Sequence, residues 1–168
     1  MTINTLEDLF VRKLAECYDA ETTLVDSLDE LARNTTNDRL SEGFADHRDE
    51  TRRHVERVEE AFEAMGRRPQ SHENRAIAAL DQERTEVEDQ VEDGDLLNTY
   101  YLGAGVTVER VEMTAYENLL TMAKQLDLDD DVTDPLEANH DEEQSAYREL
   151  DAMSTASDLK AVWDRLTS

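Results

Sequence analysis

The sequence is poor in glycine, proline and cysteine, and each shortage excludes a class of structure. Its 168 residues include five glycines, two prolines and a single cysteine, Cys17. One cysteine permits neither an intrachain disulfide nor a cysteine metal cluster, which favours a reducing compartment. Few glycines and prolines, together with the lack of an alternating β-branched pattern, predict an all-helical chain.

Long apolar runs are also missing. No stretch approaches the ~18 to 20 apolar residues that are needed to cross a bilayer. The N-terminal segment MTINTLEDLF has neither the basic region nor the apolar stretch of a signal peptide. We therefore expect a cytoplasmic protein that does not enter the membrane.

Basic residues are scarce as well. The chain has 17 Lys and Arg against 42 Asp and Glu, which gives a formal net charge of −25. A phosphate backbone requires a basic footprint, and this chain has none, so we expect no nucleic-acid partner. The acidic residues are spread through periodic apolar patterns rather than gathered in a tail, which argues against a disordered acidic chain. This composition favours a halophilic protein whose self-repulsion is screened by salt.

The apolar residues predict four long helices, a short connecting helix and a short C-terminal helix in one domain, residues 1–168. The predicted ranges are 5–33, 38–65, 74–91, 95–126, 132–153 and 156–166. Residues NTTND at 34–38 separate the first two helices, and Gly66 followed by Pro69 ends the second. Two helical hairpins joined by one long crossover predict a ferritin-like antiparallel four-helix bundle.

Each long helix carries acidic or histidine side chains in or beside its apolar stripe. In chain order they are Glu21; His47, Glu50 and His54; Glu109 and Glu112; His140 and Glu143. Counting from the hairpin turns places the glutamates near one level of the bundle. Buried ionised carboxylates cost several kcal/mol each unless a positive charge meets them, and iron and manganese favour carboxylate and imidazole ligands. The alternative is that these glutamates point outward or pair with Arg52, Arg53 or Arg110.

Four segments resemble the YciF/YciE-like family of ferritin-like proteins. They are LxxCYDAETTL at 14–24, LSEGFADHRDET at 40–51, VERVEMTAYENL at 108–119 and DEEQ at 141–144. The resemblance covers nearly the whole chain and implies a ferritin-like fold, a homodimer or higher homo-oligomer, a dinuclear metal centre and a link to stress responses. The positions that match the family motifs are Glu21, His47, Glu50, Glu109, Glu112, Glu142 and Glu143.

The chain also departs from the broader pattern of ferritin-like di-iron proteins. Those proteins place ExxH on the second and fourth helices, whereas Arg53 and Ala146 stand at the histidine positions here. If a metal pair binds, its nitrogen ligands must come from the preceding turn, at His47 or at His140, which is not part of the family motif, or the site must be rich in carboxylates. The expected metal ligands are therefore Glu21, His47, Glu50, Glu109, Glu112 and Glu143, with His54, His140 and Glu142 as secondary candidates.

Two classes of function stay open at this point. The first is a non-haem oxidoreductase with a dinuclear iron or manganese centre, which reacts with dioxygen or peroxide or oxidises ferrous iron. The second is a metal-free helical scaffold or stress protein without catalysis, in which arginines neutralise the polar layer. A mineral-storing cage is a weaker third possibility, because we identify no interface features for its assembly.

Overall fold

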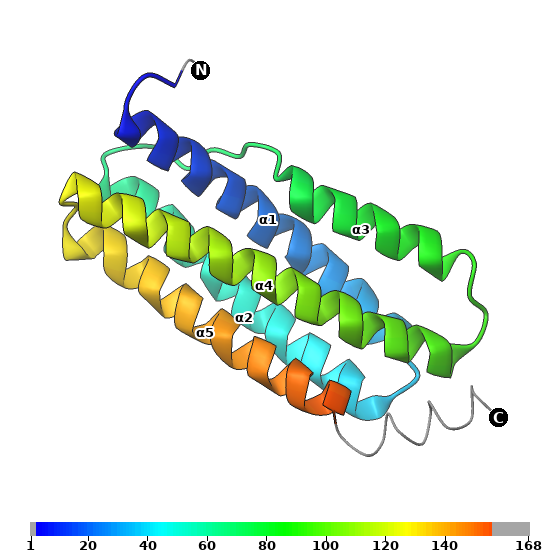
Figure 1. Cartoon of the computed structure of the whole chain (residues 1–168). Helices are drawn as coiled ribbons and strands as arrows, with labels where there is room; N and C mark the ends of the chain where they lie inside the picture. The colour runs from blue at the N-terminus through cyan, green and yellow to red at the C-terminus, as the bar shows by residue number, and fades with distance from the viewer. Residues whose placement is uncertain (1–2, 156–168) are drawn as a thin grey trace.

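Five α-helices follow one another along residues 3–155, the part of the chain that the computed structural model describes (Figure 1). They are α1 (Leu6–Asn34), α2 (Asp38–Ala64), α3 (Arg75–Glu88), α4 (Gly94–Leu126) and α5 (Asp130–Thr155). These ranges lie close to the predicted ones and confirm the all-helical fold class. The predicted helix at 156–166 lies outside the described residues.

Local sequence signals set the ends of these helices. Thr5 caps α1 in a capping box, because its side chain accepts a hydrogen bond from the Asp8 amide while the Asp8 side chain accepts one from the Thr5 amide. At the end of α2, Gly66 adopts φ 67°, a left-handed conformation that glycine takes without strain. The amide of Arg67 then donates to the carbonyl of Phe62, which closes a Schellman motif.

The four long helices form a ferritin-like bundle of two antiparallel hairpins (Figure 1). Helix α1 packs against α2 and α4, while α5 packs against α2 and α4, so each long helix has two antiparallel neighbours. The crossover from α2 to α4 runs along the length of the bundle, and α3 within it lies against α1 and α4. This arrangement lets residues from all four long helices meet at one level.

The apolar core consists of two clusters. One lies toward the α4–α5 turn and includes Phe10, Val11, Leu14, Phe62 and Leu119. The other lies toward the α1–α2 turn and includes Leu24, Phe44, Ile77, Tyr101 and Leu102. Buried polar side chains occupy the level between them, where the sequence predicts the interruptions of the apolar stripes.

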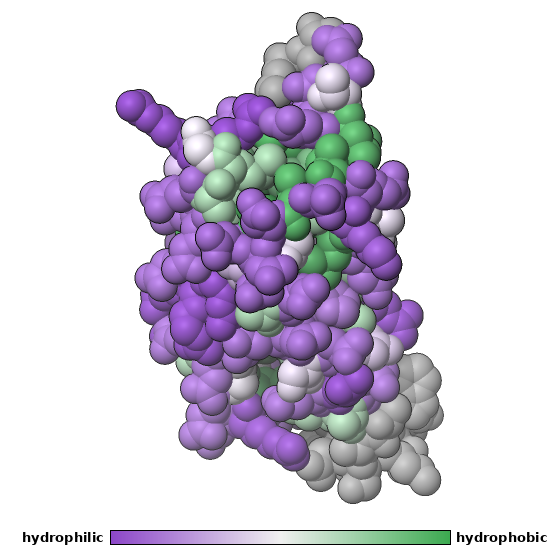
Figure 2. Space-filling model, turned by 90° about the vertical axis from the view of Figure 1, so that its left-hand side faces the viewer, coloured by the Kyte–Doolittle hydropathy of each residue, from purple (hydrophilic) through white to green (hydrophobic). Residues whose placement is uncertain are grey.

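The outside of the bundle is strongly hydrophilic. Figure 2 shows one side dominated by hydrophilic residues, with a hydrophobic area in its upper part. Among residues 3–155, no helix combines the length and the hydropathy required to cross a membrane.

Candidate metal centre

Four carboxylates and a histidine with almost no solvent exposure lie at the middle of the bundle. They are Glu21 on α1, His54 on α2, Glu109 and Glu112 on α4, and Glu143 on α5. On α2, His47 lies two turns before His54, and its side chain is only 12% exposed. All six face inward because they fall on the same helical stripes as the apolar core residues.

One group of candidate ligands surrounds His47. Its Nε2 atom lies 3.1 Å from Oε1 of Glu109 and 3.8 Å from Oε2 of Glu143. With Glu112 these residues offer ligand atoms that all lie within 4.8 Å of one another. The group is therefore small enough for one cation to contact every member.

A second group surrounds His54. Its Nδ1 atom lies 2.8 Å from Oε1 of Glu143 and 3.4 Å from Oε2 of Glu21, and these three residues also satisfy the 4.8 Å limit. Glu143 thus belongs to both groups and turns one oxygen toward each histidine.

Several carboxylate oxygens in this layer are buried and accept no hydrogen bond from the described residues: both oxygens of Glu143, Oε2 of Glu21, Oε2 of Glu109 and Oε1 of Glu112. Those of Glu143 and Glu21 have histidine nitrogens within ion-pair distance but not in hydrogen-bond geometry. An unsatisfied buried charge is costly, and native structures contain few such groups without an explanation. Carboxylate oxygens together with imidazole nitrogens are ligands that suit iron and manganese, so the residues present fit a metal pair.

Without a cation the layer retains protons. Burial raises the pKa of Glu112 well above its usual range, and the charges of Glu143 and Glu21 raise it further. Burial is also the main reason that the pKa of Glu143 rises to about 7. For His54, burial alone would lower the pKa, but the carboxylates of Glu143 and Glu21 outweigh it and raise the pKa to about 10.

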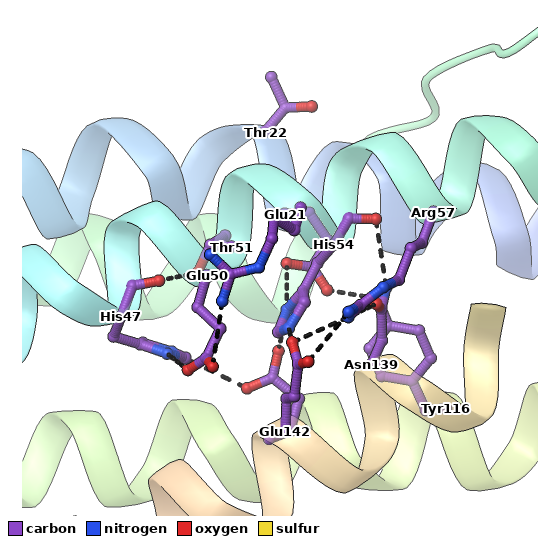
Figure 3. Close-up of polar contacts among 12 residues, drawn as sticks. Glu21, Thr22, His47, Glu50, Thr51, His54, Arg57, Tyr116, Asn139 and Glu142 are labelled. Atoms are coloured by element: carbon purple, nitrogen blue, oxygen red, sulfur yellow. Dashed lines mark hydrogen bonds and ion pairs between the residues drawn. The ribbon is translucent and has the colours of Figure 1, made fainter.

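Each histidine has its second nitrogen directed toward a carboxylate that an arginine holds. Nε2 of His54 lies 3.0 Å from Oε2 of Glu142, and Arg57 donates two hydrogen bonds to this carboxylate, at 2.8 and 2.9 Å (Figure 3). The hydrogen bonds from Arg57 are the main reason that the pKa of Glu142 falls to about 2. A carboxylate behind a histidine fixes its ring orientation, as is common around metal sites.

The arrangement around His47 is similar but looser. Its Nδ1 atom lies 3.7 Å from Oε2 of Glu50, and Arg53 donates to Oε1 of Glu50 at 3.3 Å. The side chain of Glu50 is 33% exposed, so this pair lies at the edge of the layer. Its contact with His47 lowers the pKa of Glu50.

Tyr116 and Asn139 support the Glu21 side of the layer. The hydroxyl of Tyr116 donates a short hydrogen bond to Oε1 of Glu21. Asn139 donates to the Tyr116 oxygen at 2.9 Å and to the backbone carbonyl of His54 at 3.2 Å. Both side chains are buried, so this network fixes the Glu21 carboxylate in place.

The structure brings most, but not all, of the predicted metal ligands into the two groups. It brings together Glu21, His47, Glu109, Glu112 and Glu143, and the secondary candidate His54 joins them. Glu50 lies outside both groups because Thr51, not Glu50, occupies the buried stripe of α2. Glu142 likewise lies behind His54 rather than in a group.

His140 does not reach the layer. The α5 stripe runs through Leu136, Asn139 and Glu143, which are all fully buried, and leaves His140 to one side. Its Nε2 atom lies 3.7 Å from a carboxylate oxygen of Glu117. His140 therefore lies beside the most deeply buried positions of α5 and belongs to neither group.

Sequence reasoning also missed two residues. Asn139 fits the three- and four-residue spacing between Leu136 and Glu143, so this periodicity could have identified it. Arg57 has no comparable signal, because it contacts Glu142 on a helix that is distant in sequence.

Comparisons with known proteins place this chain in one protein family. The model of a family described as "Domain of unknown function (DUF892)" matches residues 5–162. Protein YciF of Escherichia coli (strain K12) is 32% identical over 127 residues, which cover 75% of this chain and 76% of YciF.

Solved structures are similar over most of their length. YcfI of Rhodopseudomonas palustris superimposes with a TM-score of 0.85 at 31% identity, covering 89% of this chain and 94% of YcfI. The E. coli stress protein YciF gives a TM-score of 0.84 at 29% identity, with 90% of this chain and 96% of YciF covered. In sequence and in fold, therefore, this chain belongs to the DUF892 family, with YciF among its relatives.

Proposed function

We propose that this protein is a stress-associated, ferritin-like protein that binds two iron or manganese ions in the middle of its bundle and uses them in redox chemistry with dioxygen, peroxide or ferrous iron. The observation that carries the proposal is the position of Glu143, which is shared by two compact groups that each contain a histidine. One group would use His47, Glu109 and Glu112, and the other Glu21 and His54.

The distribution of cations supports this proposal over a salt-bridged scaffold. Within residues 3–155, the only basic groups in ion-pair contact with the inner carboxylates are the two histidines. Arg53 pairs with Glu50 at the edge of the layer, as the alternative expects for that residue. Arg52 pairs with Asp49, and Arg110 bonds to the hydroxyl of Tyr147, so none of the three contacts the inner carboxylates. Four buried carboxylates therefore face two imidazoles, and two divalent cations would balance their charge.

The chain's own residues prepare the site. The carboxylate of Glu142, held by Arg57, orients His54 so that its Nδ1 atom faces inward, and the Tyr116 hydroxyl holds one oxygen of Glu21. The apolar clusters lie on both sides of the layer and surround the Glu21 and His54 part of it with hydrophobic side chains. A bound pair of redox-active metal ions would supply electron transfer to or from the oxidant.

Metal analysis of protein loaded anaerobically with ferrous iron tests the proposal. We expect about two metal ions per chain, as in other carboxylate-bridged bundles. Glu143→Gln should lose most of both, because it removes the shared ligand. Glu137→Gln makes the same change at an exposed position of the same helix and should bind as the wild type does.

Fewer than one metal ion per wild-type chain would contradict the proposal, as would unchanged loading of Glu143→Gln. Melting temperatures of the metal-free proteins control for folding, since Glu143→Gln also removes a carboxylate that lies against His54. Exposure of the iron-loaded protein to dioxygen then separates redox chemistry, which oxidises the iron, from a structural metal site, which does not.

A further inference from the structure

A cavity of about 500 Å³ extends from one side of the carboxylate layer. It begins at His47, Glu109 and Glu112 and continues through the half of the bundle near the α1–α2 turn, as far as Leu31 and Met153. Its size lies within the ~300 to 1,000 Å³ that is common for sites of small organic molecules.

The wall of this cavity is predominantly apolar. All five helices contribute to it, with side chains such as Leu24, Phe44, Ile77, Val108 and Leu150. Some lining residues are exposed, among them Gly43 on α2, Gly103 on α4 and Ser145 on α5, so the cavity opens to solvent. It therefore connects the outside of the protein with the buried carboxylates.

Charge restricts what this cavity can hold. Its polar rim and floor carry the carboxylates of Asp46, Glu50, Asp81, Glu83, Glu109, Glu112 and Glu149. In the part of the chain that the structure describes, Arg84 is the one arginine that lines the cavity, and its guanidinium already pairs with Glu30, Asp81 and Glu88. Within residues 3–155, the other basic lining residue is His47, which already contacts Glu109, so an anionic group would meet no unpaired cation there. Even with two divalent ions the floor would be no more than neutral.

We propose that this cavity binds an uncharged, predominantly apolar organic molecule, with one end directed toward Glu109 and Glu112. The apolar walls give the affinity by removing hydrocarbon surface from water. The acidic rim disfavours fatty acids and other anions.

Only one of the two groups of candidate ligands can be reached from the cavity. His47, Glu109 and Glu112 line the cavity, whereas Glu21 and His54 do not. A ligand in the cavity would therefore approach only the group around His47. That this group holds a metal ion rests on the proposed function, whereas binding in the cavity does not.

Titration of the metal-free protein with the neutral fluorophore N-phenyl-1-naphthylamine tests the proposal. We expect its fluorescence to rise on binding and to fall again when 1-octanol is added. Octanoate, with a chain of the same length and a negative charge, should compete at least about tenfold less well, which corresponds to ~1.4 kcal/mol. Competition by octanoate as strong as that by 1-octanol, or no fluorescence change at all, would overturn the proposal.

Two glycines offer a way to fill the cavity. A Cβ atom added at Gly43 or at Gly103 would meet no atom within 4 Å, so both positions face open space. The double variant Gly43→Phe/Gly103→Phe should weaken probe binding at least about tenfold, because its rings occupy the cavity. The matched control Gly43→Ala/Gly103→Ala adds only methyl groups and should bind as the wild type does.

Melting temperatures of both double variants verify folding, and sedimentation reports their oligomeric state. Unchanged probe binding in a folded phenylalanine variant would overturn the proposal. If the wild type is a dimer and the phenylalanine variant is a monomer with unchanged probe binding, the face that carries Gly43 and Gly103 is instead an interface between copies of the chain.

Protein loaded with Co²⁺ tests the orientation of the ligand. We expect 1-octanol to shift the visible absorption bands of Co²⁺ in the wild type but not in Gly43→Phe/Gly103→Phe. Displacement of the probe without Co²⁺ binding would contradict the proposed function alone. Normal Co²⁺ binding without probe binding would contradict the cavity proposal alone.

Discussion

Binding of a divalent metal ion to the inner layer should release protons, so we expect the apparent affinity for Co²⁺ or Mn²⁺ to rise with pH. The pKa of His54 is raised to about 10, so its imidazole is protonated at pH 7 in the metal-free protein. A metal ion can bind its Nδ1 atom only after this charge is removed. At pH 7 that removal costs about 4 kcal/mol, because each pKa unit corresponds to ~1.4 kcal/mol.

Glu143 adds a second proton at lower pH. Burial raises its pKa to about 7, so below that value its carboxyl group must also be deprotonated before it can act as a ligand. Both pKa values are raised in the metal-free state, so binding strengthens as the pH increases through each of them. We expect the affinity to rise at least about tenfold per pH unit from pH 7 to 9, and more steeply below pH 7.

Isothermal titration calorimetry at several pH values, in buffers with different ionisation enthalpies, measures both the affinity and the number of protons released. At pH 8, His54→Gln should release about one proton fewer per chain at the same metal loading, because the substituted side chain carries no ionisable group. An affinity that is constant between pH 6 and 9, or a binding heat that does not depend on the buffer, would refute this reasoning.

Three further outcomes can be tested independently. Raising KCl from about 0.1 to 1 M shortens the screening length from ~10 to ~3 Å and should raise the melting temperature followed by circular dichroism; a flat profile would contradict the salt-adapted surface. Glu142→Gln should weaken Co²⁺ binding about 10- to 100-fold in an absorption titration, because His54 loses its orienting carboxylate; Glu137→Gln is the matched control, and equal affinities would contradict that role. Leu14→Ala, at a position with 0% exposure, should reduce the free energy of unfolding in urea by about 2 to 5 kcal/mol, and a loss below ~1 kcal/mol would count against tight packing there.

The helices could be predicted because their signals are local. A capping residue such as Thr5, a glycine stop such as Gly66 and the spacing of apolar residues each act within a few positions of the chain. Glu21 and Glu143 could be identified for the same reason, since each lies in an apolar stripe that its own helix defines.

The exact set of ligands could not be predicted from the sequence, because it depends on contacts between helices. On α2 the buried stripe passes through Phe44, Thr51, His54 and Val58, which leaves Glu50 about one residue, or ~100°, away from it. A motif that joins histidine and glutamate does not reveal which of them faces inward, because this depends on the partner helices. The contact between Arg57 and Glu142 joins α2 to α5 and has no signature in either segment alone.

The carboxylate layer and the cavity beside it also interrupt the apolar packing near the middle of the bundle. Toward the α4–α5 turn, close-packed side chains hold the helices together, whereas the layer itself is polar and the cavity lies on its other side. In the metal-free protein we therefore expect amide hydrogen exchange in the core to be fastest at the level of the carboxylate layer. Ordinary helical proteins, in contrast, open first at the ends of their helices. Cations bound in both groups would together hold ligands from all four long helices, and we expect them to slow this exchange.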